Sequence, residues 1–202
     1  MAAPTFRAPK GTKDVLPPES ARWQTLIARF ADLAGRAGYG LIQGPMFEDL
    51  EVFQRMGEGT DVVRKEMYDF EDKGGRHAAL RPEGTAGVAR AFAEHRPVPP
   101  FKVWYAAPNF RYEAPQAGRL RQHHQLGVEA IGVEDPDLDA EVIVLLADLF
   151  ASLGLQRVRL ALNSMGAPED RARFGSTPRT VRRSRATRSG CSTRSDPSRL
   201  TW

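Results

Sequence analysis

The chain has 202 residues, of which 41% are hydrophobic, so it is long enough to bury one core of single-domain size. It contains neither a bilayer-spanning apolar run of roughly 18 to 20 residues nor a recognisable signal peptide, so we expect a soluble, cytoplasmic protein without membrane partners. Residues 1–173 carry 22 basic and 24 acidic side chains whereas residues 174–202 carry seven arginines and one aspartate, so the net charge of +4 does not indicate that the body binds nucleic acid.

Hydrophobic spacing predicts the elements of the first half of the chain. Apolar residues at helical spacing indicate a helix over residues 20–37, with a glycine placed to end it. A short apolar strand over residues 40–45 and a helix over residues 50–56 follow. Strands over residues 67–71 and 78–81 then flank the sequence Asp-Lys-Gly-Gly, whose glycines favour the positive φ angles of a tight hairpin turn.

The second half repeats this mixture of helix and hairpin. A helix over residues 86–94 follows Thr85, whose hydroxyl can cap it by accepting a backbone N–H. Residues 102–112 and 125–133 are rich in aromatic and β-branched residues and predict a second antiparallel hairpin. The remaining expected elements are a helix and a strand, over residues 137–153 and 158–162.

Consecutive hairpins with intervening helices favour an α+β fold, an antiparallel β-sheet flanked by helices. We expect two regions, a folded body over residues 1–173 and a disordered tail rich in Arg, Ser and Thr over residues 174–202. The single cysteine, Cys191, excludes an internal disulfide and a cysteine-based metal cluster. His123 and His124 would point to opposite faces of a strand, so no protein-bound metal is predicted.

Charged residues are densest around the second hairpin. Arg111 projects from a strand, where a guanidinium can hold a phosphate or carboxylate through two parallel hydrogen bonds. Gln125 and Glu129 lie four residues apart on the facing strand, so their side chains share one face and can line a polar pocket. Arg119 and Arg121 flank the turn between the strands. This pattern indicates nucleotide chemistry.

These residues resemble motif 2 of the class II aminoacyl-tRNA synthetases, and among them the histidyl-tRNA synthetases most. The resemblance covers residues 5–173 and implies an incomplete catalytic core of that family. Its segments, in chain order, are Lys-Gly-Thr-Lys-Asp-Val-Leu-Pro at 10–17, residues 40–48 with Pro45, Leu-Arg-Pro-Glu-Gly-Thr-Ala-Gly at 80–87, Phe-Arg-Tyr-Glu at 110–113, Gly-Arg-Leu-Arg-Gln at 118–122 and Gln-Leu-Gly-Val-Glu at 125–129.

The resemblance implies ATP-dependent activation of histidine and its transfer to tRNA(His), with ATP bound as its Mg²⁺ complex. By position in motif 2, Arg111 would be the catalytic residue and would contact the α-phosphate. Glu113 would contact the adenine side, and Arg119 or Arg121 the outer phosphates.

The resemblance also assigns residues to histidine. Glu83 and Thr85 would accept hydrogen bonds from its ammonium group, Gly84 would let it approach, and Gln125 and Glu129 would line its pocket. Without the resemblance, Pro-Glu-Gly-Thr reads as a helix start whose first acid has a capping role.

Three further expectations concern the whole protein. The resemblance implies a homodimer formed around Pro45, with Phe47 and Phe53 contributing. The family's third motif, its histidine-specific Gly-Leu-Asp-Tyr-Tyr segment and its anticodon-binding domain are absent from the sequence, so we expect little or no activity from this chain alone. The alternative is a non-catalytic, histidine-binding regulatory paralogue that partners ATP phosphoribosyltransferase, but the ATP-handling residues favour the synthetase.

The tail does not continue the family's pattern. Read one base out of frame, codons for residues 190–195 can encode Val-Leu-Asp-Ser-Lys, a segment that the family has at this place. We therefore hypothesise a frame shift shortly after Arg173, which the nucleotide sequence would test.

Overall fold

The computed structural model describes residues 6–57, 66–113 and 119–162. Its helices and strands all lie within the unit Met1–Val158. None of the helices described is both long and apolar enough to cross a membrane. In chain order the elements are α1 (Glu19–Arg36), β1 (Gly40–Leu41), β2 (Phe47–Asp49), α2 (Leu50–Gly57), β3 (Tyr68–Glu71), β4 (His77–Leu80), α4 (Thr85–His95), β5 (Phe101–Phe110), β6 (Gln122–Ile131) and α5 (Pro136–Ser152).

The strands form two three-stranded sheets, in the orders β1-β5-β6 and β2-β4-β3, and the α+β prediction is confirmed. β5 and β6 pair antiparallel along their whole length, from Phe101 opposite Ile131 to Phe110 opposite Gln122, as the second predicted hairpin. β1 runs parallel to β5, so the larger sheet is mixed. β3 and β4 form the first hairpin, in whose turn Gly75 has a φ of +77°.

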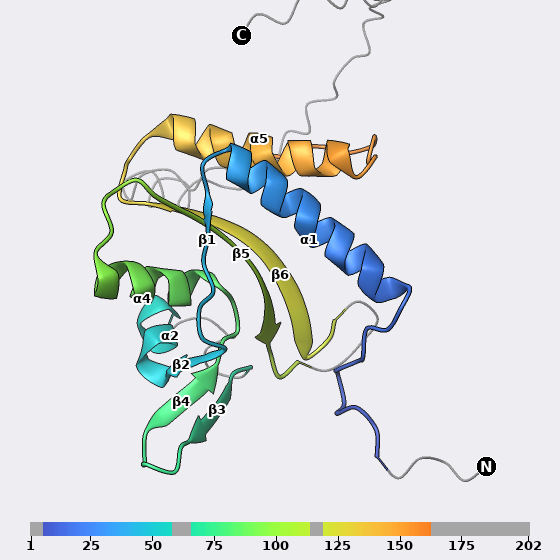
Figure 1. Cartoon of the computed structure of the whole chain (residues 1–202). Helices are drawn as coiled ribbons and strands as arrows, with labels where there is room; N and C mark the ends of the chain where they lie inside the picture. Colours follow the sequence, from blue (N-terminus) through green and yellow to red (C-terminus); the bar gives the residue numbers. More distant parts are fainter. Residues whose placement is uncertain (1–5, 58–65, 114–118, 163–202) are drawn as a thin grey trace, which may run out of the picture. The chain divides into compact units, whose positions relative to one another are not determined.

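Helices cover both faces of the larger sheet (Figure 1). α1 and α5 pack side by side on one face, where Phe30 and Leu149 belong to a buried cluster that also contacts Trp104. α4 lies against the other face, where Val88 packs against Tyr105 and its neighbours on β5. Alternate residues of β5 therefore serve two different cores, as the two-residue period of a strand requires.

A partly buried ion pair connects β5 to α5 in the layer that contains α1. The ammonium group of Lys102 on β5 donates to the carbonyl of Ala37 after α1 (2.7 Å) and lies 2.8 Å from the carboxylate of Glu141 on α5. It also lies 4.6 Å from the ring centroid of Tyr39. The hydrogen bond from Lys102 lowers the pKa of the Glu141 carboxyl, and burial raises the pKa of the Tyr39 hydroxyl. The end of α1 is thus fixed to both β5 and α5.

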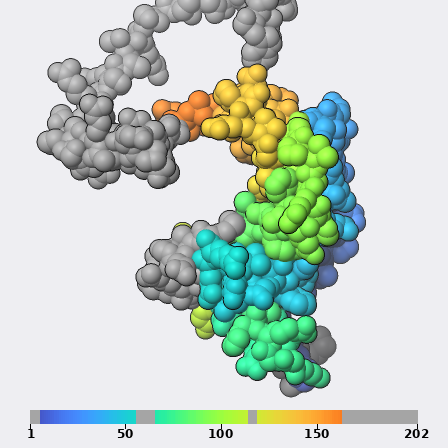
Figure 2. All heavy atoms as spheres, turned by 90° about the vertical axis from the view of Figure 1, so that its left-hand side faces the viewer, coloured from blue at the N-terminus to red at the C-terminus, as the bar shows by residue number. Residues whose placement is uncertain are grey.

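The smaller sheet and α2 lie side by side (Figure 2). Phe47 on β2 and Phe70 on β3 form an exposed aromatic pair with ring centroids 6.1 Å apart. Phe53, in contrast, is only 2% exposed and packs between α2, β4 and α4. The expectation that Phe53 contributes to a dimer contact is therefore wrong, because this side chain already belongs to the chain's own core.

Two predicted strands differ from the structure. The strand expected over residues 40–45 is only Gly40–Leu41, although the N–H of Ile42 still donates to the carbonyl of Trp104 on β5 (2.9 Å). Residues 158–162 form no strand, and Leu160 and Leu162 are 61% and 73% exposed. Within the described residues no strand pairs with them. The frame-shift hypothesis and the tail over 174–202 fall outside the described residues.

We expect Phe30→Ala to destabilise the fold by about 3 to 5 kcal/mol, because truncating a buried phenylalanine leaves a cavity. Phe30 is 4% exposed and meets Trp104 edge to face with ring centroids 5.9 Å apart. Urea unfolding followed by circular dichroism measures the change. Phe6→Ala is the matched control, since Phe6 is 89% exposed and its loss should cost less than about 0.5 kcal/mol. Equal effects of the two variants would contradict the packing described.

Candidate functional site

The candidate site lies where α4 begins against β5 and β6. The first N–H groups of a helix have no partner within the helix and need acceptors from outside it. The carboxylate of Glu83 accepts hydrogen bonds from the backbone N–H groups of Thr85 (2.7 Å) and Ala86 (2.8 Å). Oε1 of Gln125 on β6 accepts from the N–H of Gly84 (3.1 Å). The helix start is as predicted, but the capping hydroxyl expected from Thr85 is wrong, because Glu83 takes that role.

Thr85 instead binds a carboxylate on β6. Its hydroxyl donates to Oε1 of Glu129 (2.8 Å), and the hydroxyl of Tyr105 on β5 donates to the same oxygen (3.3 Å). Burial raises the pKa of the Glu129 carboxyl, although both hydrogen bonds oppose that rise, and the charge of Glu83 adds to it. Burial, followed by the charge of Glu129, likewise raises the pKa of Tyr105. Within the described residues, Oε2 of Glu129 receives no hydrogen bond, so it is available to a ligand.

Tyr105 fills the space between α4 and β6. A Cβ atom added to Gly84 would lie 2.3 Å from Cζ of Tyr105, and one added to Gly127 would lie equally close to the same atom. The ring is therefore held between two residues that have no side chain. Gly84, expected to leave room for a ligand, leaves room for Tyr105. Tyr105 was not predicted from the sequence, although a glycine inside β6, opposite Tyr105 in the sheet, is the signal of such a close approach.

Asn109 is a second residue that the sequence analysis missed. It is completely buried on β5, and its amide nitrogen donates to Oε1 of Gln125 (2.6 Å). The same oxygen accepts from Gly84, so the amide group of Gln125 is oriented by two donors. Its own NH₂ group is then left to face an acceptor. Gln125 and Glu129 do share one face of β6, as the four-residue spacing predicts, and both contact the start of α4.

Arg111 is held beside this helix start by the segment that precedes it. Its Nε donates to the carbonyl of Pro82 (2.9 Å), one residue before Glu83. Two more hydrogen bonds fasten this segment to the end of β5: from the N–H of Phe110 to the carbonyl of Arg81 (2.9 Å), and from Nε of Arg81 to the carbonyl of Pro108 (2.8 Å). Within the described residues no carboxylate pairs with Arg111, so its charge is available to an anion.

The remaining predicted residues gather at the loop end of the β5–β6 hairpin, after Phe110 and before Gln122. Arg119 pairs with the carboxylate of Glu113 at 3.2 Å, on the surface. Nε of Arg121 donates to the carbonyl of Glu113 (3.2 Å), and its guanidinium carbon lies 3.9 Å from the ring centroid of Tyr112. Arg119 and Arg121 therefore contact the segment around Glu113 rather than the start of α4. The turn itself, residues 114–118, lies outside the described residues.

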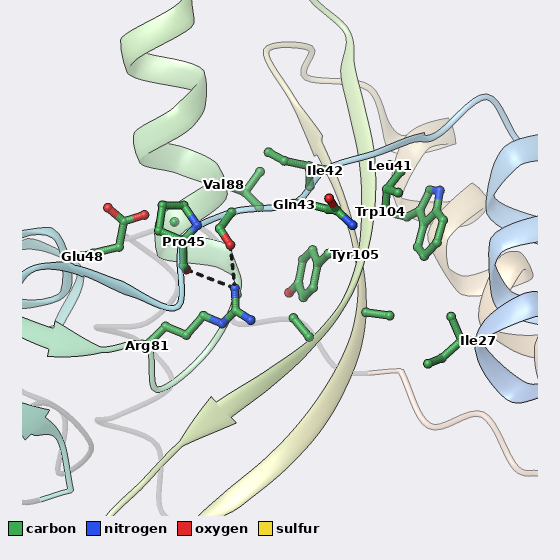
Figure 3. A pocket seen from close by; sticks show the side chains of 15 residues that line it. Ile27, Leu41, Ile42, Gln43, Pro45, Glu48, Arg81, Val88, Trp104 and Tyr105 are labelled. Carbon is green, nitrogen blue, oxygen red and sulfur yellow. Dashed lines mark hydrogen bonds between the residues drawn. The ribbon is translucent and has the colours of Figure 1, made fainter. Parts of the chain in front are cut away.

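A cavity of about 410 Å³ lies beside Tyr105, between β5, the segment after β1 and the start of α4 (Figure 3). Its walls are mostly apolar. At one end the guanidinium of Arg81 donates to the carbonyls of Gly44 (3.2 Å) and Pro45 (3.1 Å), and burial lowers the pKa of this arginine. Neither Gln125 nor Glu129 lines this cavity, but Gly84 and Tyr105 do, so the cavity adjoins the predicted histidine pocket.

The two adjacent histidines lie in different surroundings. The ring of His124 contacts that of Trp23 on α1, with ring centroids 4.9 Å apart and the ring planes tilted by 45°. Burial and, to a lesser degree, the positive charge of Arg111 lower the pKa of His123. Among the residues described, no group of three potential ligands could hold a metal ion.

Comparison with known proteins identifies the family. The family model for histidyl-tRNA synthetase matches residues 11–169. The histidine–tRNA ligase of Halothermothrix orenii is 55% identical over 172 residues, which are 83% of this chain and 41% of that protein. The ligase of Geobacillus thermodenitrificans is 52% identical over 171 residues, 82% of this chain and 40% of that protein. This chain thus spans about two fifths of the length of the curated relatives that it matches.

Solved structures agree. The apo histidyl-tRNA synthetase of S. aureus superposes with a TM-score of 0.71 at 37% identity, covering 84% of this chain and 40% of that one. A structure described as an ATP phosphoribosyltransferase regulatory subunit/histidyl-tRNA synthetase from Bacillus halodurans gives 0.66 at 26% identity, covering 77% and 40%. Because the family model covers most of this chain and these relatives are 52% and 55% identical to it over the matched residues, the chain belongs to the histidyl-tRNA synthetase family of ligases.

Proposed function

We propose that this chain forms the histidine- and ATP-binding part of a histidine–tRNA ligase. The observation that carries the proposal is the hydrogen bond from Arg111 to the carbonyl of Pro82. This bond holds Arg111, which pairs with no carboxylate among the described residues, against Pro82. Pro82 directly precedes Glu83, the first acidic residue of the polar pocket. A phosphate bound by Arg111 and an amino acid bound by Glu83 would therefore be neighbours, as a reaction between them requires.

The pocket matches the donors of histidine. Its ammonium group needs acceptors, which the carboxylate of Glu83 and the hydroxyl of Thr85 supply. A carboxylate has about four acceptor positions, so Glu83 can cap α4 and bind a ligand together. Oε2 of Glu129 is placed to accept from an imidazole N–H, and the NH₂ group of Gln125 to donate to an oxygen of the substrate. Tyr105 holds Glu129 in place through the hydrogen bond to Oε1.

The proposed reaction has two steps. A carboxylate oxygen of histidine attacks the α-phosphorus of ATP and displaces pyrophosphate, and the terminal ribose hydroxyl of tRNA(His) then attacks the activated carbonyl and displaces AMP. Arg111 stabilises the negative charge on the α-phosphate, mainly by electrostatics and alignment. Glu113 contacts the adenine side of ATP, and Arg119 or Arg121 contacts its outer phosphates. Arg119 would leave Glu113 for the phosphates, a small cost for an exposed ion pair.

The proposal includes partners that the whole ligase would need. ATP arrives with Mg²⁺, tRNA(His) is the acceptor, two copies pair around Pro45 and Phe47, and the protein works in the cytoplasm. The exposure of Phe47 and Phe70 supports the pairing surface, since an exposed aromatic pair is typical of interfaces.

The second candidate is a histidine-binding regulatory subunit. The similarity to the Bacillus halodurans structure favours it. The two candidates differ at the nucleotide, because a regulatory subunit of this kind needs the histidine pocket but not Arg111. Isothermal titration with histidine and with ATP·Mg²⁺ separates them: the ligase binds both, whereas the regulatory subunit binds histidine alone. A chain that bound neither would contradict both candidates.

We expect Glu129→Gln to weaken histidine binding at least about tenfold, because hydrogen bonds to a charged acceptor contribute roughly 1.5 to 3 kcal/mol. The fold should keep its stability at neutral pH, since the amide oxygen can still accept from Thr85 and Tyr105. Calorimetric titration measures binding, and urea unfolding measures stability. Glu134→Gln is the matched control, an exposed acid beyond the end of β6 that should change neither quantity. Unchanged histidine affinity in Glu129→Gln would exclude Glu129 from the pocket.

The same substitution should change how stability depends on pH. Because the pKa of Glu129 is raised in the folded chain, the unfolded chain ionises first as the pH rises. Stability is then lost between the ordinary glutamate pKa and the raised one, and is fully present below both. The Gln variant lacks this proton, so its unfolding free energy should fall less over that range. Urea titrations at several pH values compare the two chains, and parallel curves would contradict the raised pKa.

Arg111→Lys should weaken ATP·Mg²⁺ binding at least about tenfold and leave histidine binding unchanged, because lysine keeps the charge but loses the planar fork that binds phosphate through two hydrogen bonds. Arg36→Lys is the control, since Arg36 makes an exposed ion pair with Asp32. An equal loss of both ligands in Arg111→Lys would indicate a damaged fold, and no loss of ATP would remove Arg111 from the nucleotide site.

A further inference from the structure

The segment Pro9–Thr12 forms a tight turn that contacts the start of β6, next to the residues proposed to bind ATP. The N–H of Thr12 donates to the carbonyl of Pro9 (3.0 Å), and its hydroxyl donates to the same carbonyl (2.8 Å). Gly11, the third residue of this turn, has a φ of +83°. A positive φ at that position is the pattern of a type II turn, which requires glycine.

Gly11 contacts Arg121 in two ways: by a backbone hydrogen bond and by van der Waals packing against its side chain. The carbonyl of Gly11 accepts from the N–H of Arg121 (2.8 Å) and from the N–H of Gln122 (3.3 Å), where β6 begins. A Cβ atom added to Gly11 would lie 2.6 Å from Cγ and 2.8 Å from Cβ of Arg121. The aliphatic part of Arg121 therefore lies flat against Gly11, and a larger residue would displace it.

Arg121 transmits this contact to the residues around it. Its carbonyl accepts from the N–H of Arg111 (2.8 Å), its Nε donates to the carbonyl of Glu113, and its guanidinium covers the ring of Tyr112. One side chain thus contacts both ends of the connection between β5 and β6. Arg111 and Glu113 belong to the proposed nucleotide site, and neither touches Gly11 through any hydrogen bond in the described residues.

The geometry points to a positioning role for the Pro9–Thr12 turn: Gly11 holds Arg121, and through it Arg111 and Glu113, in the arrangement that binds ATP. Gly11 is a positioning residue and contacts no substrate. The role rests on the proposed function, since it concerns the nucleotide side of that site. The histidine pocket depends less on the turn, because Glu83, Thr85, Gln125 and Glu129 are held by hydrogen bonds among the start of α4, β5 and β6.

The test is Gly11→Ala in the whole chain, titrated separately with ATP·Mg²⁺ and with histidine. We expect ATP affinity to fall at least about tenfold, the scale of one lost charge-assisted contact, and histidine affinity to stay within about twofold. Gly35→Ala is the matched control, because Gly35 lies on α1 with no atom within 4 Å of an added Cβ.

Hydrogen exchange reads the positioning without any ligand. The amides of Arg121 and Gln122 should exchange at least about tenfold faster in Gly11→Ala than in the parent chain, while the amides of α4 keep their rates. If the parent binds both ligands and Gly11→Ala binds ATP as well as the parent, the positioning role is refuted and the proposed function stands. If the parent binds no ATP, the proposed nucleotide site fails and takes this role with it. Equal loss of ATP and histidine in Gly11→Ala, or unchanged exchange at Arg121 and Gln122, also refutes it.

Discussion

The buried amino terminus of α4 is the constraint on which the arrangement of the site depends. A helix that begins against a sheet exposes N–H groups where water cannot reach them all, and each needs an acceptor. Glu83 serves two of these groups from the preceding segment, and Gln125 serves a third from β6. Accepting these N–H groups brings the carboxylate of Glu83 and the amide of Gln125 together at the start of α4, each with hydrogen-bonding capacity left for a ligand.

The groups that bind the ligand in our proposal are thus the groups that hold the chain together. Glu83 ends the turn into α4, Thr85 and Tyr105 fix Glu129, and Asn109 orients Gln125. Such sharing keeps the pocket in shape before any ligand arrives, which lowers the ordering cost of binding. It also places one uncompensated carboxylate in partly buried surroundings, and the raised pKa of Glu129 is the cost of that arrangement.

Local patterns in the sequence were sufficient for most elements and for some of the site. Both hairpins, all four predicted helices and the shared face of Gln125 and Glu129 follow from spacing of two or 3.6 residues, which depends only on neighbours along the chain. The role of Thr85 did not follow, because a hydroxyl can bond to its own helix or to another element, and only the fold brought Glu129 near. Asn109 was missed for the same reason, since its burial is decided by the layers on either side of β5.

Tyr105 is enclosed by Gly84 and Gly127, which belong to different elements and are far apart in the sequence. A side chain at either glycine would need the ring to leave, and a smaller residue at 105 would leave a hole that neither glycine could fill. The residue at each of these three positions therefore limits which residues fit at the other two. Along any lineage that keeps this pocket, a change at one of them is tolerated only with compensating change at another, so an exchange at these sites would have to pass through an intermediate with either a collision or a void.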